Sequence, residues 1–205
     1  MYYLKNVRKV TNIMYDIDKE CLEYKRVLST NKDEMYMLMA MSAATNSKDP
    51  ATQVGACYVS ADGDLLSVGC NGTPNYWDEN EFPWGTKKEY GMKNLKYTYV
   101  IHAEMDGATN YRGSLKDFEG GTLYMTLFPC TNCAKLISSL KIKKLVYLNA
   151  REDCEDFICA NILLKKSHVE CVKFIDVVDK LQSVEFDTNG DEKTSIKIKK
   201  RSLTY

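Results

Sequence analysis

The sequence has no excess of charge of either sign. Its 205 residues carry 28 Lys and Arg against 28 Asp and Glu, so the formal net charge is zero. Proteins that bind nucleic acid usually present a basic surface, so this balance argues against nucleic acid as a partner. The chain also lacks an apolar run of membrane-spanning length, and residues 1–10 lack the apolar core of a signal peptide. These absences predict a soluble protein that does not act at a membrane.

Histidine is scarce, at two residues, whereas eight cysteines are scattered along the chain. Four of the cysteines have apolar neighbours in the sequence and are predicted to be buried free thiols: Cys57, Cys70, Cys159 and Cys171. Free thiols persist in reducing compartments. We therefore expect the protein in the cytoplasm.

One of the two histidines begins the motif on which the functional prediction rests. His102-Ala103-Glu104 is followed by Pro129-Cys130-Thr131-Asn132-Cys133. One His and two Cys can bind zinc, and three protein ligands leave the fourth tetrahedral position to a water. His-x-Glu followed by Pro-Cys-x-x-Cys is typical of zinc-dependent nucleobase deaminases. The motif predicts a zinc site made by His102, Cys130 and Cys133.

Glu104 is the candidate catalytic residue. It follows the predicted ligand His102 by two positions, which places its carboxylate within reach of a water at the zinc ion. A carboxylate there can take a proton from that water and pass it to a ring nitrogen and then to a leaving amine. The pattern therefore predicts hydrolytic deamination of an amino-pyrimidine or amino-purine.

Hydrophobic periodicity predicts a chain in which strands and helices alternate, so the fold class is α/β with parallel strands in the second half. We expect a helical N-terminal extension over residues 1–32, a zinc domain over 33–180 and a strand-rich tail over 181–205. The predicted helices cover about residues 11–28, 33–45, 102–111, 130–140 and 156–166. The predicted strands cover about residues 54–60, 65–71, 122–128, 144–148 and 169–175, with a hairpin at 183–201 and a long loop at 73–99.

Further segments outside the zinc motif resemble the deoxycytidylate (dCMP) deaminases, which belong to the zinc-dependent cytidine/deoxycytidylate deaminase family. They include Ser-Lys-Asp-Pro at 47–50, Gly-Cys-Asn-Gly-Thr-Pro at 69–74 and Leu-Phe-Pro-Cys at 127–130. Shorter matches occur at 53–56, 83–84, 97–104 and 133–137. The resemblance extends over about residues 35–186 and is more specific than the zinc motif alone.

The resemblance implies a cytidine-deaminase-like three-layer α/β/α fold with a mixed five-stranded sheet, and conversion of dCMP to dUMP and ammonia. By analogy, Asn71 would bind the sugar hydroxyl, the backbone around Val54 and Ala103 would bind the base edge, and Phe128 would line the pocket. Asn71 is also credible as a turn residue before Gly72. Family members are typically homohexamers regulated by dCTP and dTTP. Residues 73–99 contain no Cys or His, so we expect one Zn2+ per chain rather than a second, structural ion.

Three positions depart from the pattern of the family. Asn46 stands where members usually have an Arg suited to a 5′-phosphate. Asp106-Gly107 stands in place of Asn-Ala, and Asn149-Ala150-Arg151 replaces a segment with a Tyr. We expect Lys48 or Arg151 to bind the phosphate instead.

Two other functions stay open at this stage. The altered positions Asn46, Asp106 and Arg151 are compatible with a catalytically quiet, zinc-bound nucleotide sensor. The zinc motif is shared with deaminases of cytosine or adenine in nucleic acid, although the neutral charge argues against that substrate.

Overall fold

A mixed five-stranded sheet forms the centre of the protein. The computed structural model describes residues 32–177, 181–186 and 196–200. The strand order is β2-β1-β3-β4-β5, in which β1 is antiparallel to β2 and β3, while β3, β4 and β5 are parallel. The strands are β1 (Gly55–Val59), β2 (Leu65–Cys70), β3 (Thr122–Leu127), β4 (Lys144–Asn149) and β5 (Glu170–Lys173). The predicted mixed sheet is confirmed.

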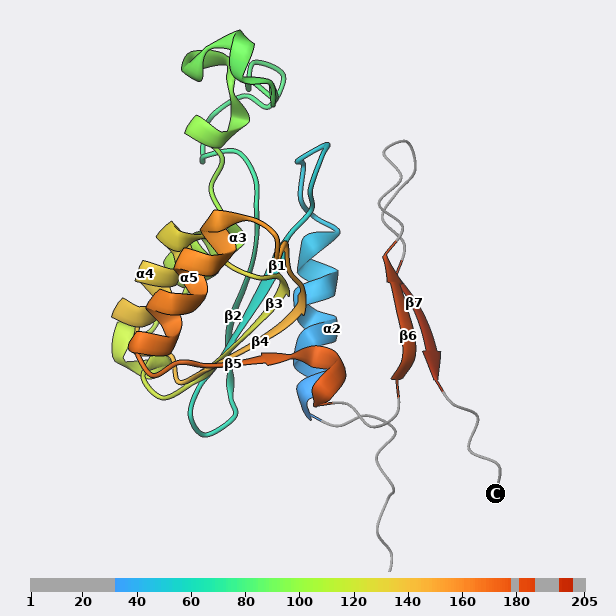
Figure 1. Cartoon of the computed structure of the whole chain (residues 1–205), viewed down its shortest axis with the longest axis vertical. Helices are drawn as coiled ribbons and strands as arrows, with labels where there is room; N and C mark the ends of the chain where they lie inside the picture. Colours follow the sequence, from blue (N-terminus) through green and yellow to red (C-terminus); the bar gives the residue numbers. More distant parts are fainter. Residues whose placement is uncertain (1–31, 178–180, 187–195, 201–205) are drawn as a thin grey trace, which may run out of the picture. The chain divides into compact units, whose positions relative to one another are not determined.

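Helices cover both faces of this sheet, which gives the predicted three layers (Figure 1). One face is covered by α2, and the other by α3, α4 and α5 (Figure 1). The helices are α2 (Lys32–Ala44), α3 (Ala103–Asn110), α4 (Thr131–Ser139) and α5 (Glu155–Lys166). Each lies within a few residues of its predicted position.

Burial on both faces explains why the central strands are apolar at successive positions. Side chains of one strand alternate between the two faces of a sheet. Cys57, Tyr124 and Val146 therefore pack with α2, whereas their neighbours Tyr58 and Leu123 pack in the core beneath the other three helices. Strands buried on both sides lose the apolar–polar alternation of a half-exposed sheet.

The predicted turn between β1 and β2 is confirmed. Gly63 has a φ of +87°, a conformation that residues with a side chain rarely adopt, and its N–H donates to Ser60 O. Farther along, the predicted 73–99 loop contains three short 3-10 turns, η2 (Lys88–Tyr90), η3 (Met92–Asn94) and η4 (Lys96–Thr98). A cluster of four aromatic rings lies in the same segment: Trp77, Phe82, Trp84 and Tyr99.

Of the two expected terminal features, the structure describes only part of one. The C-terminal hairpin is present as β6 (Leu181–Phe186) paired antiparallel with β7 (Ile196–Lys200), and its predicted turn lies outside the described residues. The predicted helix at 11–28 also lies outside them. The proposed domain boundaries stay predictions.

The prediction of four buried thiols is only partly correct. Cys57 is buried and Cys70 and Cys171 are partly exposed, but Cys159 is exposed. Cys159 lies on the outer face of α5, where its apolar neighbours Ile158 and Ile162 are themselves 50% and 56% exposed. Apolar neighbours in a sequence therefore did not imply burial here. Within the described ranges, no helix combines the length and the apolar character that a membrane span requires.

A contact between two glycines sets the distance between α3 and the sheet. A Cβ atom on Gly69 of β2 would lie 2.2 Å from the Gly107 nitrogen and 2.4 Å from the Ala103 oxygen, both backbone atoms of α3. A Cβ atom on Gly107 would lie 2.9 Å from the ring of Tyr58. The helix can therefore lie this close only because both residues lack side chains.

We expect Gly69→Ala to destabilise the protein by about 2 kcal/mol or more, because backbone atoms cannot yield to the added methyl group as a flexible side chain can. Gly72→Ala is the matched control, since a Cβ atom there would meet nothing within 4 Å. Urea unfolding of the two variants beside the unchanged protein measures the difference. Equal midpoints for both variants would contradict the proposed close contact.

Candidate active site

Two helices begin beside each other, and each begins at a predicted zinc ligand. His102 is the N-cap residue of α3 and Cys130 is the N-cap residue of α4. Only Phe128, Pro129 and the N-cap residue Cys130 lie between the end of β3 and α4, so α4 starts close to the carboxyl end of that strand. Ligand sites of α/β proteins commonly lie at this end of parallel strands. The prediction that both ligand segments lie at helix beginnings is confirmed.

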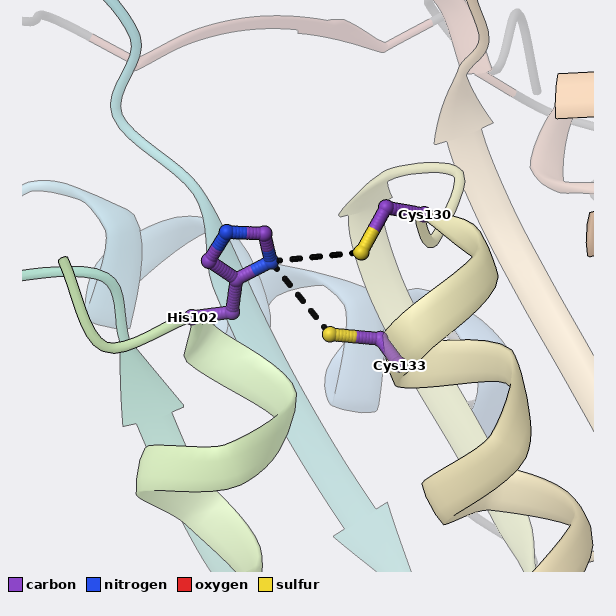
Figure 2. Close-up of side chains that lie close together, drawn as sticks. All are labelled: His102, Cys130 and Cys133. Atoms are coloured by element: carbon purple, nitrogen blue, oxygen red, sulfur yellow. Dashed lines mark hydrogen bonds between the residues drawn. The ribbon is translucent and has the colours of Figure 1, made fainter. Parts of the chain in front are cut away.

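The three predicted ligands converge (Figure 2). His102 Nδ1 lies 3.5 Å from Cys130 Sγ and 3.3 Å from Cys133 Sγ, and the three donor atoms lie within 4.8 Å of one another. Zn–S and Zn–N bonds in a tetrahedron place their donor atoms about 3.5 Å apart. The spacing and the donor types therefore fit a zinc ion with one open position.

The protonation of Cys130 also suits metal binding. A hydrogen bond from Cys133, supported by one from His102, lowers the pKa of Cys130 to about 4 although burial opposes the shift. The same bond raises the pKa of Cys133, which would lose its proton only when it binds the metal. A lower pKa favours the thiolate, which is the form that binds metal.

Glu104 lies in the first turn of α3, is 3% exposed and lines the same cavity as His102 and Cys130. Burial raises the pKa of its carboxyl group, which is the direction expected for a group that both accepts and donates a proton near neutral pH. The Tyr58 hydroxyl donates a hydrogen bond of 2.9 Å to the Glu104 carbonyl oxygen. This bond fixes the helical turn that carries the carboxylate.

The cavity has a volume of about 360 Å3, which lies in the range of small-molecule sites. One wall is aromatic: Phe128 is buried and its ring packs against Phe157 of α5 at 4.6 Å between centroids. Phe157 was not predicted, because a single aromatic residue in an amphipathic helix usually belongs to the core. Ala103 also lines the cavity, as the first residue of α3, where backbone N–H groups have no partner within the helix.

Asn71 lines the cavity too, but its amide is fully engaged by the protein. Its oxygen accepts from Val54 N and Ser47 Oγ, both at 2.7 Å, and its nitrogen donates to Thr52 O at 2.8 Å and Asp49 Oδ2 at 3.3 Å. An asparagine amide has two acceptor and two donor positions, so this set is complete. Asn71 N also donates to Val54 O. The predicted sugar contact of Asn71 stays a prediction, and it would require one of these bonds to be exchanged.

The two candidate phosphate-binding residues lie in different places. Arg151 lines the cavity that contains Glu104, and its Nη2 lies 3.4 Å from Thr52 Oγ1. Lys48 lines a second cavity of about 330 Å3 and forms an exposed ion pair with Glu79. Of the two, only Arg151 lines the cavity that contains Glu104.

Comparison with known proteins identifies the family. The family described as "Cytidine and deoxycytidylate deaminase zinc-binding region" matches residues 30–149. The chain belongs to this deaminase family. It is 35% identical to mouse deoxycytidylate deaminase over 156 residues, which cover 76% of this chain and 85% of the mouse protein. It is 32% identical to a probable deoxycytidylate deaminase of Drosophila melanogaster over 186 residues, which cover 88% of this chain and 90% of the fly protein.

A solved structure supports the same assignment. The dCMP deaminase of cyanophage S-TIM5, in complex with dCMP and dUMP, is similar with a TM-score of 0.52 and 25% identity. The similarity covers 72% of this chain and 99% of the phage chain.

The departure at Asp106-Gly107 from other deaminases of the family has a structural explanation. Asp106 Oδ2 accepts a hydrogen bond from Cys70 N at 3.0 Å, and Oδ1 accepts from Asn110 Nδ2 at 2.9 Å. The carboxylate therefore joins α3 to the end of β2 on the far side of Glu104. Gly107 leaves room for the ring of Tyr58.

Three further polar residues at this deaminase site were missed by sequence reasoning. Asp156 of α5 accepts hydrogen bonds from Thr131 N at 3.1 Å and Thr131 Oγ1 at 2.5 Å, and so anchors the residue next to Cys130. Asp49 and Lys96 form a buried ion pair in the cavity wall. Asp49 belongs to a segment that resembles the family, but neither residue has a motif that signals the pairing.

The zinc site predicts about one zinc ion per chain in protein purified with zinc present. Cys130→Ser is expected to lose most of the metal, because it removes one of three protein ligands. Cys154→Ser is the matched control, since Cys154 lines the same cavity but its Sγ accepts from Phe157 N instead of facing the other ligands. Elemental analysis of the three proteins provides the measurement. Full zinc content in Cys130→Ser would exclude Cys130 as a ligand.

Proposed function

We propose that this chain is a zinc-dependent deaminase that converts dCMP and water to dUMP and ammonia. The observation that carries the proposal is the convergence of His102, Cys130 and Cys133 beside the buried Glu104 in one cavity. The relatives named deoxycytidylate deaminase, and the phage enzyme in complex with dCMP and dUMP, support this substrate.

Glu104 is the proposed proton carrier. Bound zinc would supply a Lewis acid that lowers the pKa of a water molecule to about 7. Glu104 accepts a proton from the attacking water, delivers it to the ring nitrogen next to the reacting carbon, and assists departure of the amine as ammonia. Its burial keeps bulk water from competing for these transfers.

The walls of the cavity are proposed to bind the base between apolar and polar surfaces. Phe128 and Phe157 would supply an aromatic surface, and the N–H of Ala103, at the start of α3, would donate to a base carbonyl. Val54 completes the wall with its side chain, because Asn71 already contacts both its N–H and its carbonyl oxygen.

Arg151 is the proposed 5′-phosphate contact. It is exposed, lines the cavity and has no carboxylate partner in the part of the chain that the structure describes. A guanidinium group binds phosphate through two parallel hydrogen bonds. This assignment explains how a chain with Asn46 in place of the usual Arg would still hold a nucleotide.

Regulation by dCTP and dTTP, a homohexamer and a cytoplasmic location are part of the same proposal. The second cavity supports an effector site, because Asn71 lines both cavities. Consecutive residues of α3 also line different cavities: Glu104 lines the first, and Met105 and Asp106 line the second. A nucleotide in the second cavity would therefore contact the opposite side of the wall that holds the substrate.

Glu104→Gln is expected to lower dCMP turnover by at least about a hundredfold while zinc content stays unchanged, because the amide cannot carry the proton. Ultraviolet change and ammonia release would be measured with dCMP, deoxycytidine, CMP and dCTP, with and without dCTP or dTTP as effector. Ile162→Leu is the control, since Ile162 is 56% exposed on α5 and lines neither cavity. Undiminished activity in Glu104→Gln would overturn the mechanism, and no turnover of dCMP by the unchanged protein would overturn the function.

Arg151→Ala is expected to raise the KM for dCMP about tenfold and to change the KM for deoxycytidine little, because a lost charged hydrogen bond costs about 1.5–3 kcal/mol. Lys48→Ala removes the same charge from the second cavity and should leave both values near those of the unchanged protein. Steady-state kinetics on the two substrates make the comparison. A parallel rise for both substrates in Arg151→Ala would remove Arg151 from phosphate binding.

A further inference from the structure

The wall of the candidate active site contains a fully buried ion pair that takes no part in the proposed chemistry. Lys96 Nζ lies 2.7 Å from both carboxylate oxygens of Asp49, and each residue is 3% exposed. Removing two charges from water costs more free energy than their attraction commonly returns, so apolar residues of the same size would often be as stable. The pair therefore calls for an explanation other than stability.

The Asp49 carboxylate is the centre of a hydrogen-bond network. Its Oδ1 also accepts from the backbone N–H groups of Ala51 at 2.8 Å and Thr52 at 3.1 Å, and its Oδ2 accepts from Asn71 Nδ2. With Lys96, these contacts occupy the acceptor positions that a carboxylate offers. The orientation of Asp49 is thus fixed from several sides.

Two branches lead from Asp49 to the proposed nucleotide contacts. In one branch, Asp49 holds Thr52 N, and Thr52 Oγ1 contacts Arg151 Nη2. In the other, Asp49 holds the Asn71 amide, which in turn binds Val54 N. Both branches end at residues that line the cavity, and neither passes through His102, Glu104, Cys130 or Cys133.

Lys96 fixes the other end of the pair. Its backbone N–H donates to Gly85 O at 2.9 Å, and its carbonyl oxygen accepts from Val100 N at 2.8 Å. A Cβ atom on Gly85 would lie 2.3 Å from Asn94 O. The backbone at Gly85 is therefore in direct contact with the backbone just before Lys96. Lys96 therefore projects from a tightly packed base into the cavity wall.

We infer that the Lys96–Asp49 ion pair is a positioning device that holds Arg151 and Val54 in place for the nucleotide. The inference rests on the proposed function for the identity of the nucleotide, but the positioning itself involves only contacts within the protein. Lys96 and Asp49 act through Thr52 and Asn71 rather than on the reacting atoms. They are expected to govern substrate affinity more than the chemical step.

The test replaces Lys96 with Met, which keeps the length of the side chain and removes its charge. We expect the KM for dCMP to rise about tenfold or more, because two branches of contacts are loosened at once, while kcat changes less than about twofold and zinc content is unchanged. Asp49→Asn serves as the second variant, since it keeps the shape of the side chain and should raise KM in the same way.

Val146→Ala is the matched control for loss of stability alone. Val146 is fully buried in the core beneath α2, on the opposite face of the sheet from α3 and α4. The control should lower the melting temperature and leave KM unchanged. If Lys96→Met and Asp49→Asn behave as this control does, with KM unchanged, the pair is only structural and the inference is wrong.

Hydrogen exchange gives a readout that needs no substrate. In Lys96→Met, the amides of Ala51, Thr52 and Val54 should exchange faster, while those of α3 keep their protection. Unchanged exchange at these three amides would overturn the inference even if dCMP were not turned over. Failure of the unchanged protein to deaminate dCMP would count against the proposed function instead, so the two failures are distinguishable.

Discussion

The distance between the beginnings of two helices determines what this chain can do. A tetrahedral metal site needs its protein donors about 3.5 Å apart, and here one donor lies at the start of α3 and two lie in the first turn of α4. The position of α4 follows from β3, because only the three residues 128–130 join the strand to the helix. The position of α3 depends on the contact of Gly69 with Gly107. The geometry of the metal site is therefore a consequence of how closely α3 can approach the sheet.

The metal ligands and the loops of the cavity wall are held in place by different interactions. The ligands and Glu104 lie at helix beginnings above a packed apolar core, where small displacements are resisted by the whole domain. The part of the cavity wall around Asp49, Asn71 and Arg151 comes from loops, which cannot be fixed by apolar packing alone because their backbone groups need polar partners. A buried ion pair and a saturated asparagine supply those partners. The metal ligands and the proposed nucleotide contacts are therefore held by separate sets of interactions.

The sequence was informative where chemistry is local and uninformative where it depends on distant residues. His102, Cys130 and Cys133 could be predicted because the residue types and spacing of a zinc site are restrictive. Alternation of strands and helices predicted only the α/β class with parallel strands, whereas the three layers and the mixed sheet were expected from the resemblance to the deaminase family. The pairing of Lys96 with Asp49 could not, because 47 positions separate them and a lysine in a polar segment usually faces water. The complete set of hydrogen bonds on the Asn71 amide could not be predicted either, since its partners come from residues 47–54, outside its own turn.

Asp106, which stands where Asn was expected from the family pattern, is held in place by the hydrogen bonds that it accepts. The Asp106 carboxylate meets two donors, accepting from Cys70 N at Oδ2 and from Asn110 Nδ2 at Oδ1. An asparagine could bind the same two partners if the Asn110 amide turned over, because its oxygen would accept from Cys70 N and its nitrogen would donate to Asn110 Oδ1. The carboxylate satisfies both partners, and its charge is directed toward the second cavity, away from Glu104. The departure from the family pattern thus preserves the link between α3 and β2 on which the metal site depends, and it gives no support to a loss of catalysis.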